Sequence, residues 1–165
     1  IVYGISEFSL AEDIGVSRYE AREYIDNYLT NYSGVRTYMK KVVEDAREIG
    51  YTQTMYGRRR YIPELKSSNF NIRQGAERIA LNTPIQGTAA DIIKMAMVTI
   101  HRRLKEEGLK AQMIMQVHDE LNFNVPISEV DRVREIVVSE MQNVVHLTVP
   151  LIADCGIGAN WLQAH

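Results

Sequence analysis

The sequence lacks several features that mark whole classes of protein. Its single cysteine, Cys155, excludes an internal disulfide framework and a zinc site built from cysteines. No apolar run approaches the ~18 residues of a membrane span, so we expect no membrane partner. No secretory signal peptide, repeat or Gly-rich phosphate loop is visible in these 165 residues, and the four histidines are not at zinc spacing. We therefore expect a cytoplasmic globular domain and, because the chain opens with Ile1 rather than Met, a piece of a longer protein.

The composition suits an ordinary globular chain with a polarised charge. The 165 residues are 45% hydrophobic and 24% charged, which is enough to bury a core. The formal net charge of −2 excludes a strongly basic protein that coats nucleic acid. Locally, residues 56–73 hold five basic side chains and one acidic, whereas residues 119–165 hold seven acidic and two basic. One segment suits phosphates and the other suits cations.

Hydrophobic periodicity and turn residues predict an α+β fold. Residues 1–68 are expected to be helical, with capping boxes at Ser9 and Ser17 and a small hairpin near residues 51–62. A long helix is expected over residues 69–107, with a kink or break at Pro84, which cannot donate a backbone hydrogen bond.

The last third is predicted to form a small antiparallel sheet packed on long helices. Strands are expected at residues 111–117, 121–125 and 151–157, with a helix starting after Ser128 between the second and third strands. The predicted organisation is therefore a helical portion, residues 1–68, followed by an α+β portion, residues 69–165.

The turn between the first two of these strands carries the most chemistry. Two-residue hairpin turns need positive φ, which His118 and Asp119 adopt poorly. Residues that do not suit their turn are often retained for function, so this turn is a candidate functional site. Asp119 and Glu120 could share a hard cation such as Mg²⁺. A solvated turn without function is the alternative that the turn alone leaves open.

Two further sets of residues could contact nucleic acid. Arg78, Asn82 and Gln86 follow one another at a spacing of four, so they share a helical face that can hydrogen-bond an extended polar partner such as the DNA minor groove. An ordinary solvated helix face is the alternative. A basic run after Gly57 could contact phosphates, or could simply be a solvated hairpin; it consists of Arg58, Arg59 and Arg60.

These residues fall within motifs of a known family. Residues 116–121 (QVHDEL) resemble motif C, the palm hairpin of family A DNA polymerases of the bacterial DNA polymerase I type. Residues 76–94 resemble the long palm helix of that family, and residues 3–6 the end of its fingers helix. Residues 57–63 and the terminal Asn160-Trp161 are also typical. The similarity covers essentially the whole chain in order, as part of the fingers (1–68) and a partial palm (69–165).

The resemblance implies a DNA-directed DNA polymerase that adds deoxynucleotides to a primer 3′-hydroxyl with two Mg²⁺ ions in replication and repair. Asp119 would bind metal, Glu120 would support the metal site and His118 would lie by the primer terminus. Primer-template DNA would be contacted by Arg78, Asn82, Gln86, Tyr3, Arg58, Arg59 and Arg60, and deoxynucleoside triphosphates would be the substrates. The parent enzyme would be a monomer in the bacterial cytoplasm, associated with the nucleoid.

The resemblance also implies what the 165 residues lack. The family's second metal-binding Asp comes from motif A, which does not occur here, and the fingers cations that bind the triphosphate are absent too. The chain is thus expected to be about the last fifth of a polymerase, inactive by itself and prone to self-association through an uncovered strand edge. A nucleic-acid-binding module without catalysis and part of a single-subunit RNA polymerase are the alternative interpretations.

Overall fold

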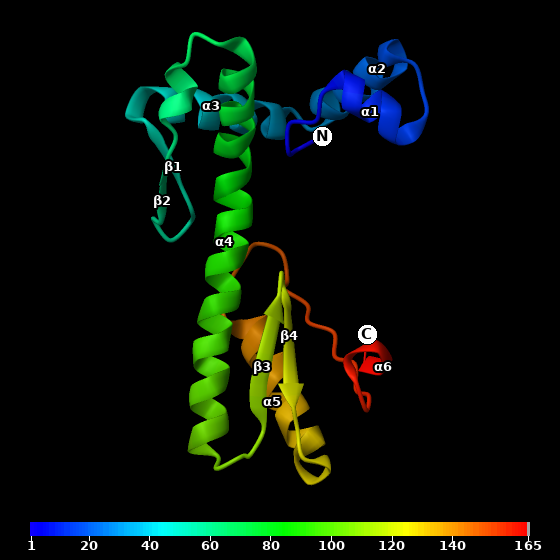
Figure 1. The fold of residues 1–165 in the computed structure, drawn as a ribbon, viewed down its shortest axis with the longest axis vertical. Helices are drawn as coiled ribbons and strands as arrows, with labels where there is room; N and C mark the ends of the chain where they lie inside the picture. Colours follow the sequence, from blue (N-terminus) through cyan, green and yellow to red (C-terminus); the bar gives the residue numbers. More distant parts are fainter. Residues whose placement is uncertain (165) are drawn as a thin grey trace. The chain divides into compact units, whose positions relative to one another are not determined.

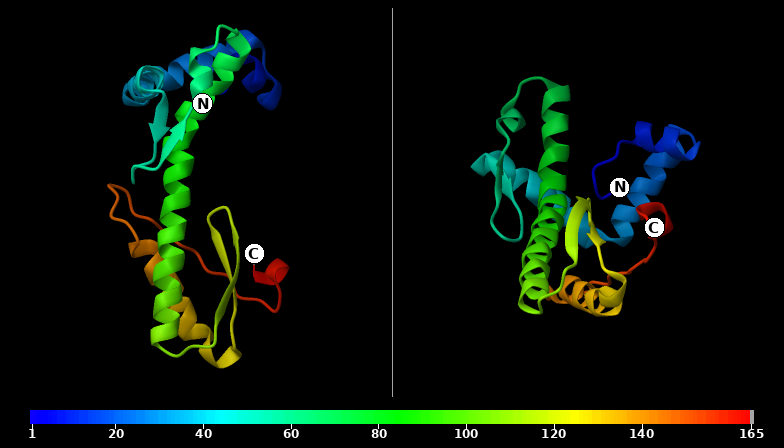
Figure 2. Two further views of the ribbon diagram at one scale, coloured as in Figure 1. Left: turned by 60° about the vertical axis from the view of Figure 1, so that its left-hand side comes forward. Right: turned by 60° about the horizontal axis from the view of Figure 1, so that its bottom comes forward.

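The computed structural model describes residues 1–164, which form two compact units. The first unit comprises residues 1–88 and the second starts at residue 89. Helix α4 (Phe70–Glu106) contributes residues to both units, as its course in Figures 1 and 2 shows. No helix among residues 1–164 is long and apolar enough to cross a membrane. The α+β class is confirmed, since helices dominate and each unit adds one two-stranded sheet.

The first unit opens with three helices whose ends follow the local sequence. They are α1 (Glu7–Ile14), α2 (Arg18–Asn31) and α3 (Ser33–Ile49). Ser17 forms the predicted capping box with Glu20. The capping box predicted at Ser9 is wrong, because α1 starts earlier and Ser6 accepts a hydrogen bond from the Ser9 backbone N–H over 3.1 Å.

The predicted hairpin of the first unit is confirmed. Strand β1 (Tyr51–Gln53) pairs antiparallel with β2 (Arg59–Tyr61), and a short 3₁₀ helix, η1 (Pro63–Lys66), follows. Gly57 takes a φ of 78° in the loop, which a residue with a Cβ adopts only at a cost. The buried core of this unit joins α3, the end of the hairpin, η1 and α4, and it consists of Ala46, Ile62, Leu65, Ala76 and Ala80.

Helix α4 is continuous through Pro84, so the predicted break is absent. Proline leaves the carbonyl four positions earlier, that of Ala80, without its helical donor. The hydroxyl of Thr52 on β1 donates to this carbonyl over 3.4 Å, in a buried position. The hairpin thus supplies a hydrogen bond to the carbonyl that Pro84 leaves without its helical donor.

The hydrogen bond from Thr52 to the Ala80 carbonyl is expected to contribute to stability. Thr52→Val keeps the shape of the side chain but leaves the Ala80 carbonyl without a donor, which should lower the free energy of unfolding by about 1 kcal/mol. In a Pro84→Ala background the backbone N–H at position 84 can serve Ala80, so the same Thr52→Val change should cost nearly nothing. Urea unfolding of the four proteins measures the difference, and an equal cost in both backgrounds would contradict the compensation.

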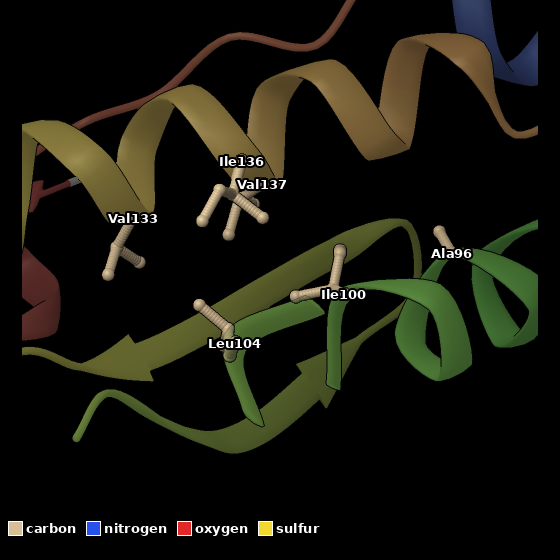
Figure 3. Close-up of a cluster of buried hydrophobic side chains, with 6 residues drawn as sticks. All are labelled: Ala96, Ile100, Leu104, Val133, Ile136 and Val137. Carbon is tan, nitrogen blue, oxygen red and sulfur yellow. The ribbon is translucent and has the colours of Figure 1, made fainter. Parts of the chain in front are cut away.

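The second unit packs one helix pair against one hairpin. Strands β3 (Gln112–Val117) and β4 (Glu120–Asn124) pair with each other, and η2 (Ile127–Glu129) leads into α5 (Val130–Asn143). Figure 3 shows the core between the second half of α4 and α5, made of Ala96, Ile100, Leu104, Val133, Ile136 and Val137. The hairpin covers this core with partly buried side chains that include Met113, Leu121 and Phe123.

The third strand predicted at residues 151–157 does not form. That segment carries no ladder hydrogen bonds, and within residues 1–164 the sheet of this unit has two strands only. Alternating apolar residues favour a strand, but a strand forms only where the segment packs beside a sheet edge, and this segment does not pair with the β3–β4 hairpin. The segment instead leads as an extended strap into the short helix α6 (Trp161–Ala164).

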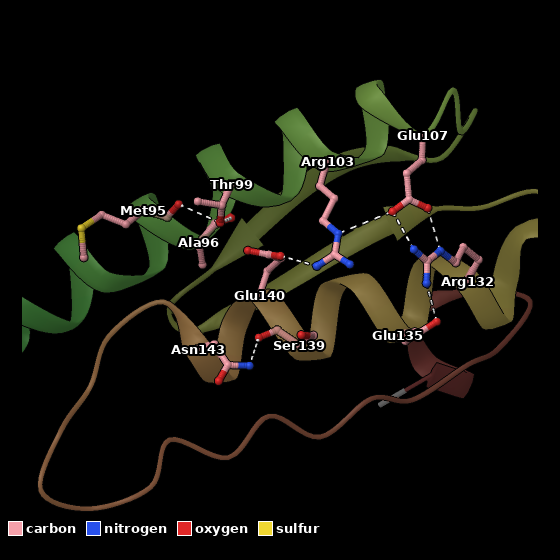
Figure 4. Close-up of polar contacts among 10 residues, drawn as sticks. All are labelled: Met95, Ala96, Thr99, Arg103, Glu107, Arg132, Glu135, Ser139, Glu140 and Asn143. Atoms are coloured by element: carbon pink, nitrogen blue, oxygen red, sulfur yellow. Dashed lines mark hydrogen bonds and ion pairs between the residues drawn. The ribbon is translucent and has the colours of Figure 1, made fainter.

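Ion pairs hold α4 against α5 at the surface of this core (Figure 4). Arg132 donates to both carboxylate oxygens of Glu107 over 2.6 and 2.7 Å, and Arg103 joins Glu107 to Glu140. The hydrogen bonds from Arg132 lower the pKa of Glu107 below its ordinary value of 4.5. A carboxyl whose pKa is depressed by folding stabilises the fold above its ordinary pKa and loses this effect as the pH falls. The contribution of Glu107 to the contact between α4 and α5 is therefore expected to weaken at low pH.

Candidate functional site

The catalytic candidates lie at the turn between β3 and β4. Val117 pairs with Glu120, so His118 and Asp119 form a two-residue turn. His118 has a φ of 52° and is the single non-glycine residue with positive φ among residues 1–164. The prediction that this turn needs positive φ is thus confirmed. A left-handed conformation of this kind costs about 1–2 kcal/mol, and such strain is common at functional sites.

Hydrogen bonds hold the strained turn in place. The side chain of Gln116 donates from Nε2 to the carbonyl oxygen of His118 over 2.7 Å, which closes the turn from the β3 side. The side chains of His118 and Asp119 are both exposed at the tip. The partly buried side chains of both strands pack on the core of the unit and hold the hairpin in place. The hairpin therefore exposes Asp119 to solvent at a fixed tip.

Glu120 differs from Asp119 in its surroundings. It is half-buried, and its Oε1 accepts hydrogen bonds from Asn122 Nδ2 over 3.0 Å and from Trp161 Nε1 over 2.7 Å. Sequence reasoning linked neither Asn122 nor Trp161 to the turn. Asn122 could have been found, since alternate residues of a strand share a face. Trp161 is typical of the family, but it is 41 positions away and nothing in the sequence links it to the turn.

The two carboxylates suit a hard divalent cation. Mg²⁺ is usually bound through one or two carboxylates and completes its shell with water and substrate phosphates. Asp119 and Glu120 match that donor set, and no group of three or more potential ligands exists in the part of the chain that the structure describes. The hairpin tip therefore fits Mg²⁺ as part of a shared site and not as a complete cage.

The polar helix face of the first unit is preserved by the continuity of α4. Arg78 and Gln86 are exposed on this helix, and Asn82 lies between them at the same spacing. The Oδ1 atom of Asn82 is buried and has no hydrogen-bond partner among residues 1–164, and such an unsatisfied buried atom is exceptional in proteins. A face with one cation and two amides suits a polar groove rather than an apolar partner.

The structure also brings the N-terminal segment to this face. A Cβ atom on Gly4 would lie 3.3 Å from Leu81 Cδ1 and 3.6 Å from Arg78 Cγ, so the chain passes close to α4 there. Gly4 has a φ of 77°, which favours glycine at this close approach. Tyr3, its neighbour, is half-exposed. The predicted DNA-binding residues Tyr3 and Arg78 are thus carried by segments in contact.

The basic hairpin is fixed on the same helix. The backbone N–H of Met55 donates to Thr88 Oγ1 over 2.9 Å, and a Cβ atom on Gly87 would come within 2.7 Å of Thr54 Cγ2. Gly87 and Thr88 directly follow Gln86, and sequence reasoning missed their role, which depends on contacts more than thirty positions away. The hairpin exposes Arg58, Arg59 and Arg60.

One of these arginines is ordered by an aromatic ring. The guanidinium of Arg59 lies 4.7 Å from the ring centroid of Tyr51 on the paired strand. Such a contact holds the side chain without neutralising its charge. The first unit therefore offers a positively charged hairpin and a polar helix face on one support, and the second offers an acidic turn.

The acidic turn, the polar helix face and the basic hairpin together form an α+β arrangement that suits the binding of a cation and of nucleic acid. Comparison with known proteins identifies the family. The sequence model of DNA polymerase family A matches residues 1–163, and the chain belongs to this family. It is 50% identical over 163 residues to DNA polymerase I of Caldicellulosiruptor bescii and 49% identical over 164 residues to DNA polymerase I of Bacillus subtilis.

The similarity covers nearly all of this chain and a small part of its relatives. Each alignment spans 99% of the chain and 19% of the relative. A solved structure, the POL domain of Pol1 from M. smegmatis in complex with DNA primer-template and dNTP, superposes with a TM-score of 0.94 at 45% identity. It covers 99% of this chain, which spans 29% of that protein chain.

Proposed function

We propose that the chain forms the part of a bacterial DNA-directed DNA polymerase that carries motif C, the polar palm helix and a phosphate-binding hairpin. The observation that carries the proposal is the strained two-residue turn that presents Asp119 in a family A chain. The reaction is the addition of a deoxynucleotide to a primer 3′-hydroxyl. Primer-template DNA and dNTP as partners are supported by the complex of the M. smegmatis relative.

In this proposal Asp119 and Glu120 hold Mg²⁺ at the hairpin tip. When bound, Mg²⁺ supplies stabilisation of the negative charge that develops on the attacking and leaving oxygens. The hairpin keeps the carboxylate of Asp119 on a fixed support, and His118 lies by the primer terminus. The second carboxylate of the family, that of motif A, does not come from these 165 residues, so the reaction needs a longer protein.

The first unit would hold the DNA. Arg78, Asn82 and Gln86 contact the minor groove and backbone near the new base pair, and Tyr3 stacks near the templating position. Arg58, Arg59 and Arg60 neutralise phosphates. The intact enzyme acts as a monomer on the nucleoid in the cytoplasm. A binding module without catalysis describes the 165-residue chain when it is separated from motif A.

A comparison of neutral and charged contacts tests this division of roles. In a complete polymerase that contains this chain, Gln86→Ala should slow extension about tenfold, most strongly after a mispair, because it removes roughly 1.4 kcal/mol of groove contact. It should leave the salt dependence of DNA binding unchanged, since a neutral amide releases no counterions. Changing a hairpin arginine that contacts a phosphate to glutamine should reduce the slope of log K against log salt by about 1, where K is the DNA-binding constant.

Arg36→Gln is the matched control, because Arg36 is exposed but its charge already pairs with Asp26 over 3.7 Å. It should change neither rate nor slope. Equal slopes for the Gln86 variant and the hairpin variants would contradict the assignment of groove and phosphate contacts.

The hairpin of the second unit should promote association of the isolated chain. Strands β3 and β4 pair only with each other among residues 1–164, and Ile114 and Met115 remain 59% and 38% exposed. An uncovered edge with apolar side chains pairs readily with another chain. We expect light scattering to show dimers or larger species whose population falls when Ile114→Lys places a charge on the strand. A monodisperse monomer at high concentration would contradict this expectation.

A further inference from the structure

The short C-terminal helix α6 contacts the turn that carries the metal-binding candidates. Trp161 at its start donates from Nε1 to Glu120 Oε1 over 2.7 Å. An indole N–H can only donate, so Glu120 must accept in this contact. Asn122 donates to the same oxygen over 3.0 Å. Two neutral donors from different parts of the chain therefore converge on one carboxylate oxygen.

The strap that leads to α6 is shaped to bring Trp161 to this place. A Cβ atom on Gly156 would lie 1.7 Å from the carbonyl oxygen of Ala164, and one on Gly158 would lie 2.7 Å from the Ala164 nitrogen. No side chain fits at either glycine without moving the backbone of α6. The strap and the helix thus form one compact loop.

Two further hydrogen bonds close this loop. Asn160 Oδ1 accepts from the Gln163 backbone N–H, and Gln163 Oε1 accepts from the Ala159 backbone N–H, both over 3.1 Å. They fix the backbone on either side of Trp161. The indole therefore sits on a local support rather than on a freely moving terminus.

We propose that Trp161 is a positioning residue that holds the Glu120 carboxylate beside Asp119. The proposal rests on the proposed function, in which these two carboxylates hold Mg²⁺. Adjacent carboxylates repel each other, and a hydrogen bond to a charged acceptor is roughly twice as strong as a neutral one. An indole stabilises the charge of Glu120 without adding a positive charge that would compete with the cation, as a lysine or arginine would.

Kinetics of a complete polymerase that contains this chain test the proposal. Trp161→Phe keeps a ring and removes the donor, so we expect a kcat about tenfold lower and a several-fold higher Mg²⁺ concentration for half-maximal rate, which corresponds to about one strong hydrogen bond. DNA affinity and Tm should not change. Leu162→Ala is the control, because Leu162 is the next residue on α6 and 88% exposed; it should behave as the parent.

A double-mutant cycle shows whether Trp161 acts through Glu120. In a Glu120→Gln background, Trp161→Phe should change log kcat by less than half as much as it does when Glu120 is present, because the charged acceptor is already absent. Full additivity would overturn the proposal, as would a Trp161→Phe enzyme with the Mg²⁺ dependence of the Leu162→Ala control. A loss of Tm in Trp161→Phe equal to its loss of rate would also overturn it, because the residue would then be merely structural.

A measurement without catalysis separates this proposal from the proposed function. Trp161 is the only tryptophan of the 165-residue chain, so in that chain, with Ile114→Lys to reduce its association, the indole N–H gives one assignable NMR signal. Glu120→Gln should shift this signal and speed its exchange with water, whereas Asp154→Asn, at an exposed site of the same strap, should not. An unchanged signal in Glu120→Gln overturns the contact whatever the reaction is. A signal that responds to Glu120→Gln, together with an Asp119 that is dispensable for catalysis, would contradict both the proposed function and the positioning role in catalysis. The contact between Trp161 and Glu120 would still be confirmed.

Discussion

Asp119→Ala in a complete polymerase that contains this chain is expected to lower the rate of nucleotide addition by about a thousandfold or more. Removing a metal-binding carboxylate should remove several kcal/mol of charge stabilisation in the transition state, and each 1.4 kcal/mol is about tenfold in rate. The Kd for primer-template DNA should change less than about threefold, because in the proposed site the exposed carboxylate at the turn would contact the cation and not phosphates. Single-turnover incorporation and equilibrium DNA binding measure the two quantities.

Asp154→Ala serves as the control for Asp119→Ala, since it removes an exposed aspartate of the same unit away from the turn. It should leave both rate and affinity unchanged. Parallel losses of DNA affinity and turnover in Asp119→Ala would assign this residue to binding instead of catalysis, and would contradict the proposed metal site.

The 165-residue chain by itself is expected to show no primer extension. Two-metal sites hold their ions about 3.5–4 Å apart, which needs carboxylates from more than one segment. Within residues 1–164 there is no group of three His, Cys, Asp or Glu side chains that could hold an ion alone. The family resemblance implies in addition that the fingers cations for the triphosphate lie outside these 165 residues.

Extension of a labelled primer by the purified chain at millimolar Mg²⁺ would contradict the expected inactivity. Circular dichroism shows whether the chain is folded in the same buffer, so that inactivity is not confused with unfolding. The chain should still bind primer-template DNA weakly through the first unit, and Arg58→Gln should weaken that binding at low salt. Binding without extension would separate DNA binding by this chain from nucleotide addition.

The parts that could be predicted from sequence depend on residues close together in the chain. Ser17 and Glu20 cap a helix because they are three positions apart, and the stripe of Ile100 and Leu104 lies on one helix face for the same reason. The His118–Asp119 turn is of this kind too, because a two-residue link between paired strands demands positive φ whatever surrounds it. The family motifs add their functional roles by resemblance only.

The parts that the sequence did not determine depend on partners far along the chain. Pro84 alone predicts a break in α4, but the hydroxyl of Thr52, 28 positions away, supplies the missing donor. Residues 151–157 have the pattern of a strand but do not pair with the β3–β4 hairpin, and their strap instead carries Trp161 to Glu120. Hydrophobic period and turn chemistry act within a few residues, so the sequence by itself determined the five longer helices, both hairpins and the acidic turn. Which distant donor reaches which buried or charged acceptor depends on how the elements pack, and only the tertiary structure decided that.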